Sequence, residues 1–223
     1  MGKTIRFLVL VLMGFSLAGC ASYYNVKVNG YTAPVAAGEI KPGSTFFVME
    51  NKEAKNPLLE QEIRDKITKL LEVRGYPVTT TFDKADYYLF FGYGLGEPRS
   101  VGVPEYYGGV GWGWGWGGGW GCGWGGPAVC LGGPPYGYWW TDIVTLYDRW
   151  LQINVVEGPP YRTQKISRSV WVGEARSTGF SSDLRTVLNY LLVANFKEFG
   201  KNTGKAVTIN IKQDDPAVFA LTH

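Results

Sequence analysis

The sequence predicts an α+β domain of two layers, in which a mostly antiparallel sheet carries two helices on one face. Two observations lead to this prediction. Strand patterns outnumber helix patterns, and most strands follow one another through turns. Two segments show the three-and-four spacing of apolar residues that is typical of an amphipathic helix. A Gly/Trp-rich loop insertion at 97–140 interrupts the domain, which we place at 43–213.

The first half of the domain begins with a β-rich run at 45–49. A helix follows, with Asn56 as its N-cap and Gly75 where it stops. Its apolar residues share one face: Leu59, Ile63, Ile67, Leu70 and Leu71. A short strand at 78–82 then leads to an aromatic strand at 87–91 that is apolar on both faces. Such a strand is normally covered on both sides, which favours core packing over a ligand platform.

The second half of the domain contains a long hairpin and a second helix. The hairpin pairs β-rich segments at 143–156 and 165–178 through a turn at 157–160. The helix opens near 181–182, with Asp183 in its first turn. Its apolar face consists of Leu184, Val187, Leu188, Leu191, Leu192, Phe196 and Phe199.

The domain closes with a single strand after this helix. Gly200 or Gly204 ends the helix, and the strand spans 206–211. Its inward residues are Val207, Ile209 and Ile211. The acidic, proline-containing segment at 214–223 is predicted to be a flexible tail.

The N-terminal segment has the pattern of an export signal. Lys3 and Arg6 precede an apolar run at 7–12, which is too short for a helix of ~20 residues that spans a membrane. The following Leu17-Ala18-Gly19-Cys20 resembles a bacterial lipobox. That resemblance implies a signal peptide at 1–19, cleavage before Cys20 and lipidation of its sulfur with fatty acids such as palmitate. The alternative is an ordinary secretory signal with a chance cysteine.

An acylated Cys20 would anchor the chain to membrane lipid, and two or more acyl chains anchor stably. Ala21 stands where an aspartate would retain the protein in the inner membrane. We therefore expect attachment to the outer membrane, with the domain in the periplasm of the cell envelope. Residues 20–42 are assigned to a lipidated tether, although Val26 and Val28 alternate with polar residues as in a strand.

Composition excludes several classes of function. The formal net charge is +3, and removal of residues 1–19 leaves a chain of 204 residues with a charge of about +1 and no basic stripe. Nucleic acid is therefore not an expected partner. His223 is the single histidine, so we predict neither a metal site nor a catalytic triad, and no cofactor.

The Gly/Trp-rich run is the least regular part of the chain. Between Tyr107 and Trp140 lie fifteen glycines and seven of the nine tryptophans. In an extended chain the alternating tryptophans would share one face. They could stack on glycan sugars, sit at a membrane interface, or contact another copy or another envelope protein. The alternative is a low-complexity loop without fixed structure. The candidate contact residues are Trp112, Trp114, Trp116, Trp120 and Trp124.

Cys122 and Cys130 lie within the same run and enclose seven residues. An oxidising periplasm would allow a disulfide between them, and closure of so short a loop would stabilise the fold by about 2 kcal/mol. Because the spacing is not Cys-x-x-Cys, a structural cross-link is favoured over a redox function.

No residue is predicted to be catalytic. The carboxylates on or between the hairpin strands are Asp142, Asp148, Glu157 and Glu174. Two of them on one face could form an acid/base pair for glycan hydrolysis, but nothing in their spacing requires it. Solvent-facing acids are the favoured interpretation.

Four stretches, taken in order, resemble a family of Gram-negative envelope lipoproteins known as domain of unknown function 4136. They are Asn56-Pro57-Leu58-Leu59, Arg74-Gly75-Tyr76, Ala85-Asp86-Tyr87-Tyr88-Leu89 and Trp171-Val172-Gly173-Glu174-Ala175. The resemblance covers roughly residues 45–211, and members often carry a Gly/aromatic-rich run at mid-domain. It implies a lipid-anchored periplasmic domain without an established activity.

We therefore expect a non-catalytic outer-membrane lipoprotein with a binding or structural function, whose Gly/Trp-rich loop contacts peptidoglycan or another envelope protein. Two alternatives remain at this point: an envelope enzyme that acts on peptidoglycan or other glycans, and a self-associating structural component of the envelope.

Overall fold

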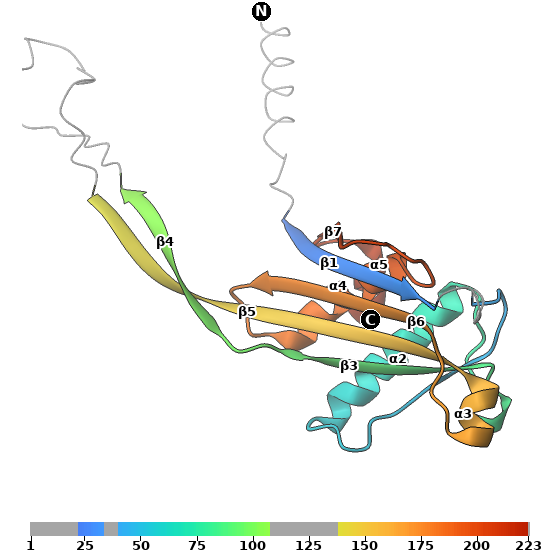
Figure 1. Ribbon diagram of the computed structural model, residues 1–223. Helices are drawn as coiled ribbons and strands as arrows, with labels where there is room; N and C mark the ends of the chain where they lie inside the picture. The colour runs from blue at the N-terminus through green and yellow to red at the C-terminus, as the bar shows by residue number, and fades with distance from the viewer. Residues whose placement is uncertain (1–21, 34–39, 108–137, 223) are drawn as a thin grey trace, which may run out of the picture. The chain divides into compact units, whose positions relative to one another are not determined.

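The computed structural model describes residues 22–33, 40–107 and 138–222 (Figure 1). Two sets of predicted functional residues lie outside these ranges. One is the lipobox with Cys20. The other is the central part of the Gly/Trp-rich run, with its five candidate tryptophans, Cys122 and Cys130.

The described chain forms one sheet of seven strands. They are β1 (Tyr23–Thr32), β2 (Phe46–Val48), β3 (Tyr87–Leu95), β4 (Arg99–Tyr107), β5 (Tyr138–Glu157), β6 (Ser169–Gly179) and β7 (Val207–Lys212). The order is β2-β3-β5-β6-β1-β7, and β4 pairs with β5 off this path. The β2–β3 pair is parallel and all the others are antiparallel. The predicted α+β class with a mostly antiparallel sheet is confirmed.

Helices α2 (Pro57–Val73) and α4 (Leu184–Lys197) lie on the same side of the sheet (Figure 1). Asn56 and Asp183 cap them by accepting hydrogen bonds from the N–H groups of Leu59 and Thr186, each at 3.1 Å. The apolar residues of each helix recur at helical spacing, so they share one face, and this face packs against the sheet. The fully buried side chains at the centre of this layer include Ile63, Ile67, Leu71, Leu188 and Leu191.

Strand β1 lies inside the sheet, between β6 and β7. Val26 and Val28 are fully buried, and Val28 pairs with Ala175 on one side and Val207 on the other. Ten of the 23 residues assigned to a tether at 20–42 therefore form strand β1, and the folded domain begins there and not at residue 43. The alternating valines reach the core because β1 lies between β6 and β7 and contacts α4.

The predicted hairpin of β5 and β6 is confirmed, but its connection is not a simple turn. Helix α3 (Gly158–Gln164) joins the strands. Gly158 is required at its start, because a Cβ there would lie 2.4 Å from the carbonyl oxygen of Ala85. The predicted strand at 78–82 is wrong. Val78 makes only an isolated bridge to Phe46, because β2 spans only three residues, and Phe82–Lys84 forms a 3₁₀ turn, η1.

The aromatic strand β3 is covered on both faces, as predicted. Tyr87 and Leu89 enter the core beneath the helices. On the opposite face Tyr88 stacks with Phe82 at 4.6 Å between ring centroids, and its hydroxyl donates to the Phe82 carbonyl at 2.7 Å. Tyr161 of α3 lies over the same face, 5.2 Å from Tyr88.

The C-terminal segment forms helix α5 (Pro216–Thr222), where the sequence predicts a flexible tail at 214–223. Val218 and Leu221 are buried, and the Asp215 carboxylate accepts a hydrogen bond from the N–H of Ala217 at 2.9 Å. The apolar pair is too short a signal to indicate a helix alone. Packing against α4 stabilises it.

The chain divides into two compact units. One comprises the residues up to Glu97 together with those from Tyr147 onward, and the other is Pro98–Leu146. In the second unit β4 pairs with the first part of β5 over nine residue pairs, from Arg99↔Leu146 to Tyr107↔Tyr138. We call this two-stranded segment the ribbon. Regular strand therefore occupies both ends of the region predicted as a loop insertion at 97–140.

Candidate functional site

The four carboxylates considered for catalysis do not form a pair in the described structure. Asp148 accepts a hydrogen bond from the Thr178 hydroxyl at 2.6 Å, and Glu157 lies 3.3 Å from the Arg168 guanidinium. Glu174 lies 3.9 Å from Arg176. The fourth, Asp142, belongs to the ribbon, where it pairs with Val103.

The register also separates the two acids that share a sheet face. Asp148 pairs with Thr178, whereas Glu174 pairs with Gln152, four residues further along β5. At ~3.4 Å per residue this offset is about 14 Å, more than the ~5–9.5 Å between the carboxyl groups of glycosidases. Among the described residues, no three His, Cys, Asp or Glu side chains gather as metal ligands. None of the described helices is both long and apolar enough to span a membrane.

A charged cavity of about 350 Å³ lies among α2, α4 and α5. The Lys66 ammonium donates to the Glu62 carboxylate at 2.5 Å and to the Asn189 side-chain oxygen at 2.7 Å, and Arg185 lies 2.7 Å from Glu62. Burial raises the pKa of Glu62, but the hydrogen bonds and charges of Lys66 and Arg185 outweigh it and bring the pKa below its ordinary value. These ion pairs join α2 to α4, with two cations on the single carboxylate of Glu62.

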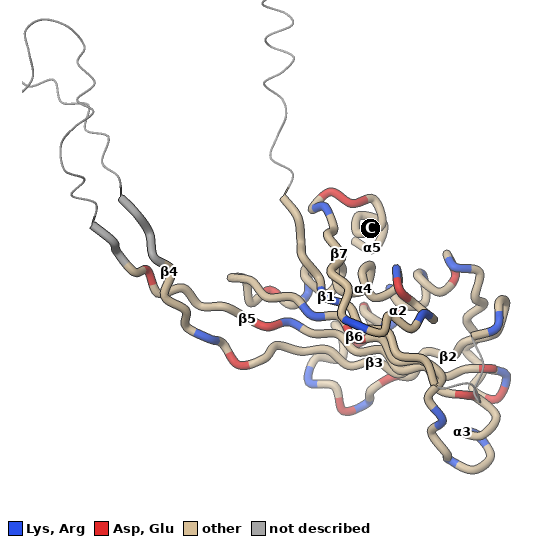
Figure 2. The backbone as a smooth tube through the Cα atoms, turned by 45° about the horizontal axis from the view of Figure 1, so that its top comes forward, with Lys and Arg blue, Asp and Glu red and all other residues tan. Residues whose placement is uncertain are grey.

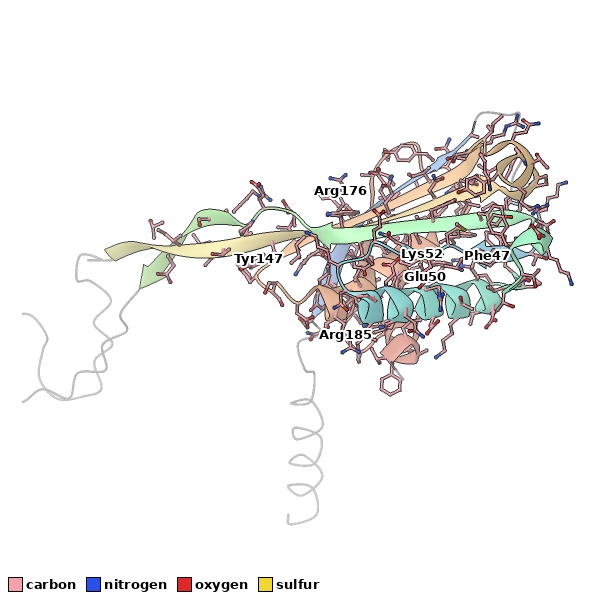
Figure 3. All side chains as sticks on the ribbon, turned by 90° about the horizontal axis from the view of Figure 1, so that it is seen from below. Phe47, Glu50, Lys52, Tyr147, Arg176 and Arg185 are labelled. Atoms are coloured by element: carbon pink, nitrogen blue, oxygen red, sulfur yellow. The ribbon has the colours of Figure 1, made fainter. Side chains whose placement is uncertain are left out.

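The sheet face opposite α2 and α4 carries a second group of polar residues. Leu151, Ile153 and Ala175 are buried under the helices, so the alternate residues of β5 and β6 point the other way. Figure 3 shows Arg176 on this side of the sheet and Arg185 on the helix side. We call this surface the open face. Its members are Lys27, Asn29, Gly92, Gly94, Trp150, Gln152, Glu174 and Arg176.

The indole of Trp150 covers two glycines on the open face. A Cβ atom at Gly94 would lie 2.9 Å from Cζ2 of Trp150, and one at Gly92 would lie 3.6 Å from Cζ3. The ring therefore occupies space that side chains on β3 would otherwise fill. It remains 37% exposed. Trp150 was not among the residues predicted from the sequence. The alternation of Gly92 and Gly94 within an aromatic strand is the sequence signal that indicates close packing by a neighbouring group.

The ribbon carries exposed apolar side chains. Ile143 is 77% exposed, and Val101 and Val103 are each 38% exposed. A two-stranded ribbon is marginally stable in water by itself, and such side chains gain from being covered. The ribbon connects directly to the Gly/Trp-rich run, which places the two candidate contact segments next to each other in the chain.

The α+β fold and the four matching stretches agree with a comparison to known families. The family model described as a domain of unknown function, DUF4136, matches residues 31–199. The chain belongs to this family. No curated protein matches the chain. Family membership thus identifies the domain without assigning an activity to it.

Three solved structures show a distant similarity to the chain. A PDZ domain protein from Parabacteroides distasonis is 12% identical with a TM-score of 0.46, over 89% of this chain and 41% of its own length. The PelC dodecamer from Paraburkholderia phytofirmans is 12% identical with a TM-score of 0.38, over 79% of this chain and 99% of its own. A DUF4136 family protein from Bacteroides thetaiotaomicron is 15% identical with a TM-score of 0.34, over 78% and 92%.

Proposed function

We propose that this protein is a non-catalytic lipoprotein of the bacterial envelope that is anchored in the outer membrane through acylated Cys20. Its domain lies in the periplasm and works by binding. The ribbon and the adjoining Gly/Trp-rich run form the contact surface, and the partner is peptidoglycan or another envelope protein.

The observation that carries this proposal is the exposed apolar surface of the ribbon. Val101 and Val103 lie on one face of the ribbon, and Ile143, which pairs with Gly102, lies on the other face. The ribbon forms a compact unit of its own. A partner that covers either face would remove apolar area from water, at about 25 cal/mol per Å². The tryptophans of the adjoining run would add large amphipathic rings to the same contact. The lipobox pattern supports the anchor.

The test separates the lipid anchor from the contact surface. Cys20→Ala removes the proposed acylation site, so any association that remains with isolated envelopes comes from protein contacts. In this background, residues 98–146 are replaced by Asn-Gly, which joins Glu97 to Tyr147. This closure suits a two-residue hairpin turn, because Leu95 already pairs with Arg149 and the Gly96 N–H donates to the Asp148 carbonyl at 2.7 Å.

We expect the Cys20→Ala chain to sediment with isolated envelopes and the shortened chain to stay in solution, with both chains folded by circular dichroism. A full-length variant that combines Val101→Ser, Val103→Ser and Ile143→Ser should also stay in solution. The matched control is Leu58→Ser, an exposed apolar residue on α2 that should change nothing. Equal sedimentation of all variants, or failure of the shortened chain to fold, would overturn the proposal.

A further inference from the structure

We propose that the open face binds a saccharide chain, with the Trp150 ring as the stacking platform and Gln152, Glu174 and Arg176 as the hydrogen-bonding groups. This site lies wholly within the main unit of the chain. It is independent of the ribbon and of the function proposed above.

Trp150 lies on the open face, where it remains partly exposed. A tryptophan side chain is normally buried in a core or an interface, where it removes 150–250 Å² of its surface from water. Here two glycines on the neighbouring strand keep a site free for it, and the ring rests over them instead of over side chains. The core of the sheet lies on the other face, with Leu151 and Ile153. Trp150 therefore adds a flat apolar surface to a face that the core does not use.

Polar side chains lie next to the Trp150 ring on the open face. Trp150 pairs with Arg176, and the next outward pair is Gln152 with Glu174. Gln152 and Arg176 are exposed and Glu174 is half-buried. An amide, a carboxylate and a guanidinium together supply both donors and acceptors. Hydroxyl groups, which also donate and accept, are suited to such a mixed set.

The open face continues across strand β1 beyond these residues. Lys27 pairs with Arg176 and Asn29 with Glu174, so polar side chains extend the same rows. Neighbouring strands are ~4.8 Å apart, and four strands from β3 to β1 therefore span about 14 Å. This width accommodates several linked sugar rings rather than a single one.

The composition of the face argues against other ligands. A protein interface would have an apolar core poor in charge, whereas one indole here is surrounded by charged and amide groups. Nucleic acid would require a basic surface, but Glu174 lies 3.9 Å from Arg176, and Figure 2 shows acidic and basic residues interspersed along the described chain. A saccharide combines flat apolar ring faces with hydroxyls at the rim, which matches a ring bordered by polar groups.

The experiment measures binding of two soluble probes to the purified full chain by isothermal titration calorimetry. The probes are the β-1,4-linked tetramers of N-acetylglucosamine and of glucose. We expect at least one of them to bind, and Trp150→Ala to weaken that binding at least tenfold. Gln152→Ala combined with Arg176→Ala should weaken it several-fold, with unfolding midpoints unchanged because both side chains are exposed. The control is Phe180→Ala, an exposed aromatic residue outside the open face.

Three results would overturn the inference. The first is that neither tetramer binds at millimolar concentration. The second is that the Gln152→Ala/Arg176→Ala chain, which keeps the core intact, binds as tightly as the unmodified chain. The third comes from the chain in which Asn-Gly replaces 98–146. Loss of saccharide binding there would assign the ligand to the ribbon or the Gly/Trp-rich run, whereas retention supports the open face even if the ribbon proposal fails.

Discussion

The side chain of Asn195 on α4 lies directly against Gly173 on β6. A Cβ atom at Gly173 would fall 2.4 Å from Oδ1 of Asn195 and 2.1 Å from Cη2 of Trp171. Asn195 is fully buried. In the stretch Trp171-Val172-Gly173-Glu174-Ala175, the alternate residues Trp171, Gly173 and Ala175 face the helices. Because Gly173 has no side chain, α4 packs closely against β6 at this position.

Gly173→Ala should destabilise the fold, because the added methyl group has no space between Trp171 and Asn195. Overpacking of this kind costs about 1–3 kcal/mol. Urea unfolding followed by circular dichroism measures the change. Gly92→Ala is the matched control, since its methyl group would meet the Trp150 ring at an ordinary 3.6 Å. Equal destabilisation by both substitutions would contradict the close approach of α4 to β6.

Tyr93→Phe tests the hydrogen bond between the Tyr93 hydroxyl and the buried carboxylate of Glu60. Burial, then the charge of Glu60, then a hydrogen bond to it raise the pKa of Tyr93 to about 12. Because folding favours the neutral hydroxyl, its contribution to stability is complete below pH 10 and is lost as pH rises from 10 towards 12. Without the hydroxyl, Glu60 keeps the N–H of Asn51 at 3.2 Å as a partner.

We expect Tyr93→Phe to cost about 1–3 kcal/mol at pH 7, and the difference from the unmodified chain to shrink above pH 10. Unfolding midpoints in urea between pH 7 and 11.5 measure both. Tyr31→Phe, on an exposed side chain of β1, should have little effect at pH 7. A difference that grows with pH would show that the sign of this coupling is wrong.

Asp183→Ala should weaken the start of α4 by about 1 kcal/mol at pH 7, the usual value of an N-cap. Hydrogen bonds from the side chain and backbone of Thr186 lower the pKa of Asp183 below its ordinary 3.8. The lowered pKa means that its contribution is present above pH 3.8 and lost as pH falls through the folded-state value. Thermal unfolding between pH 2 and 7 checks this, and Asp183→Asn, which still caps, should stay close to the unmodified chain at pH 7.

Lys66→Met should be more destabilising than Arg185→Ala, although both residues pair with Glu62. Lys66 is buried and also holds the buried Asn189, whose side-chain oxygen would lose its donor at a cost of about 1–3 kcal/mol. The Arg185 side chain is 73% exposed, and such surface pairs contribute ~0–1 kcal/mol. Chemical denaturation gives the order of the two effects, and the reverse order would contradict the structural importance of Lys66.

Local signals predicted much of this fold. The capping position at Asn56 and the helical spacing of Leu188 and Leu191 depend on residues within a few positions, so the sequence alone determined where α2 begins and what both helices bury. The predicted start of α4 at 181–182 lies one or two residues before its cap, Asp183. The aromatic run of β3 likewise indicated a strand covered on both faces. The lipobox and the Gly/Trp-rich run can also be recognised from the sequence. The functions assigned to them stay predictions.

Tertiary structure decided what depends on distant partners. Val28 joins the core because Ala175 lies beside it in the sheet, a pairing across most of the chain that no local pattern specifies. Helix α5 forms because α4 offers a surface for Val218 and Leu221. Trp150 remains exposed because its strand register turns it away from the helices and above Gly92 and Gly94. Periodicity assigns a residue to a face, but only long-range packing determines what covers that face.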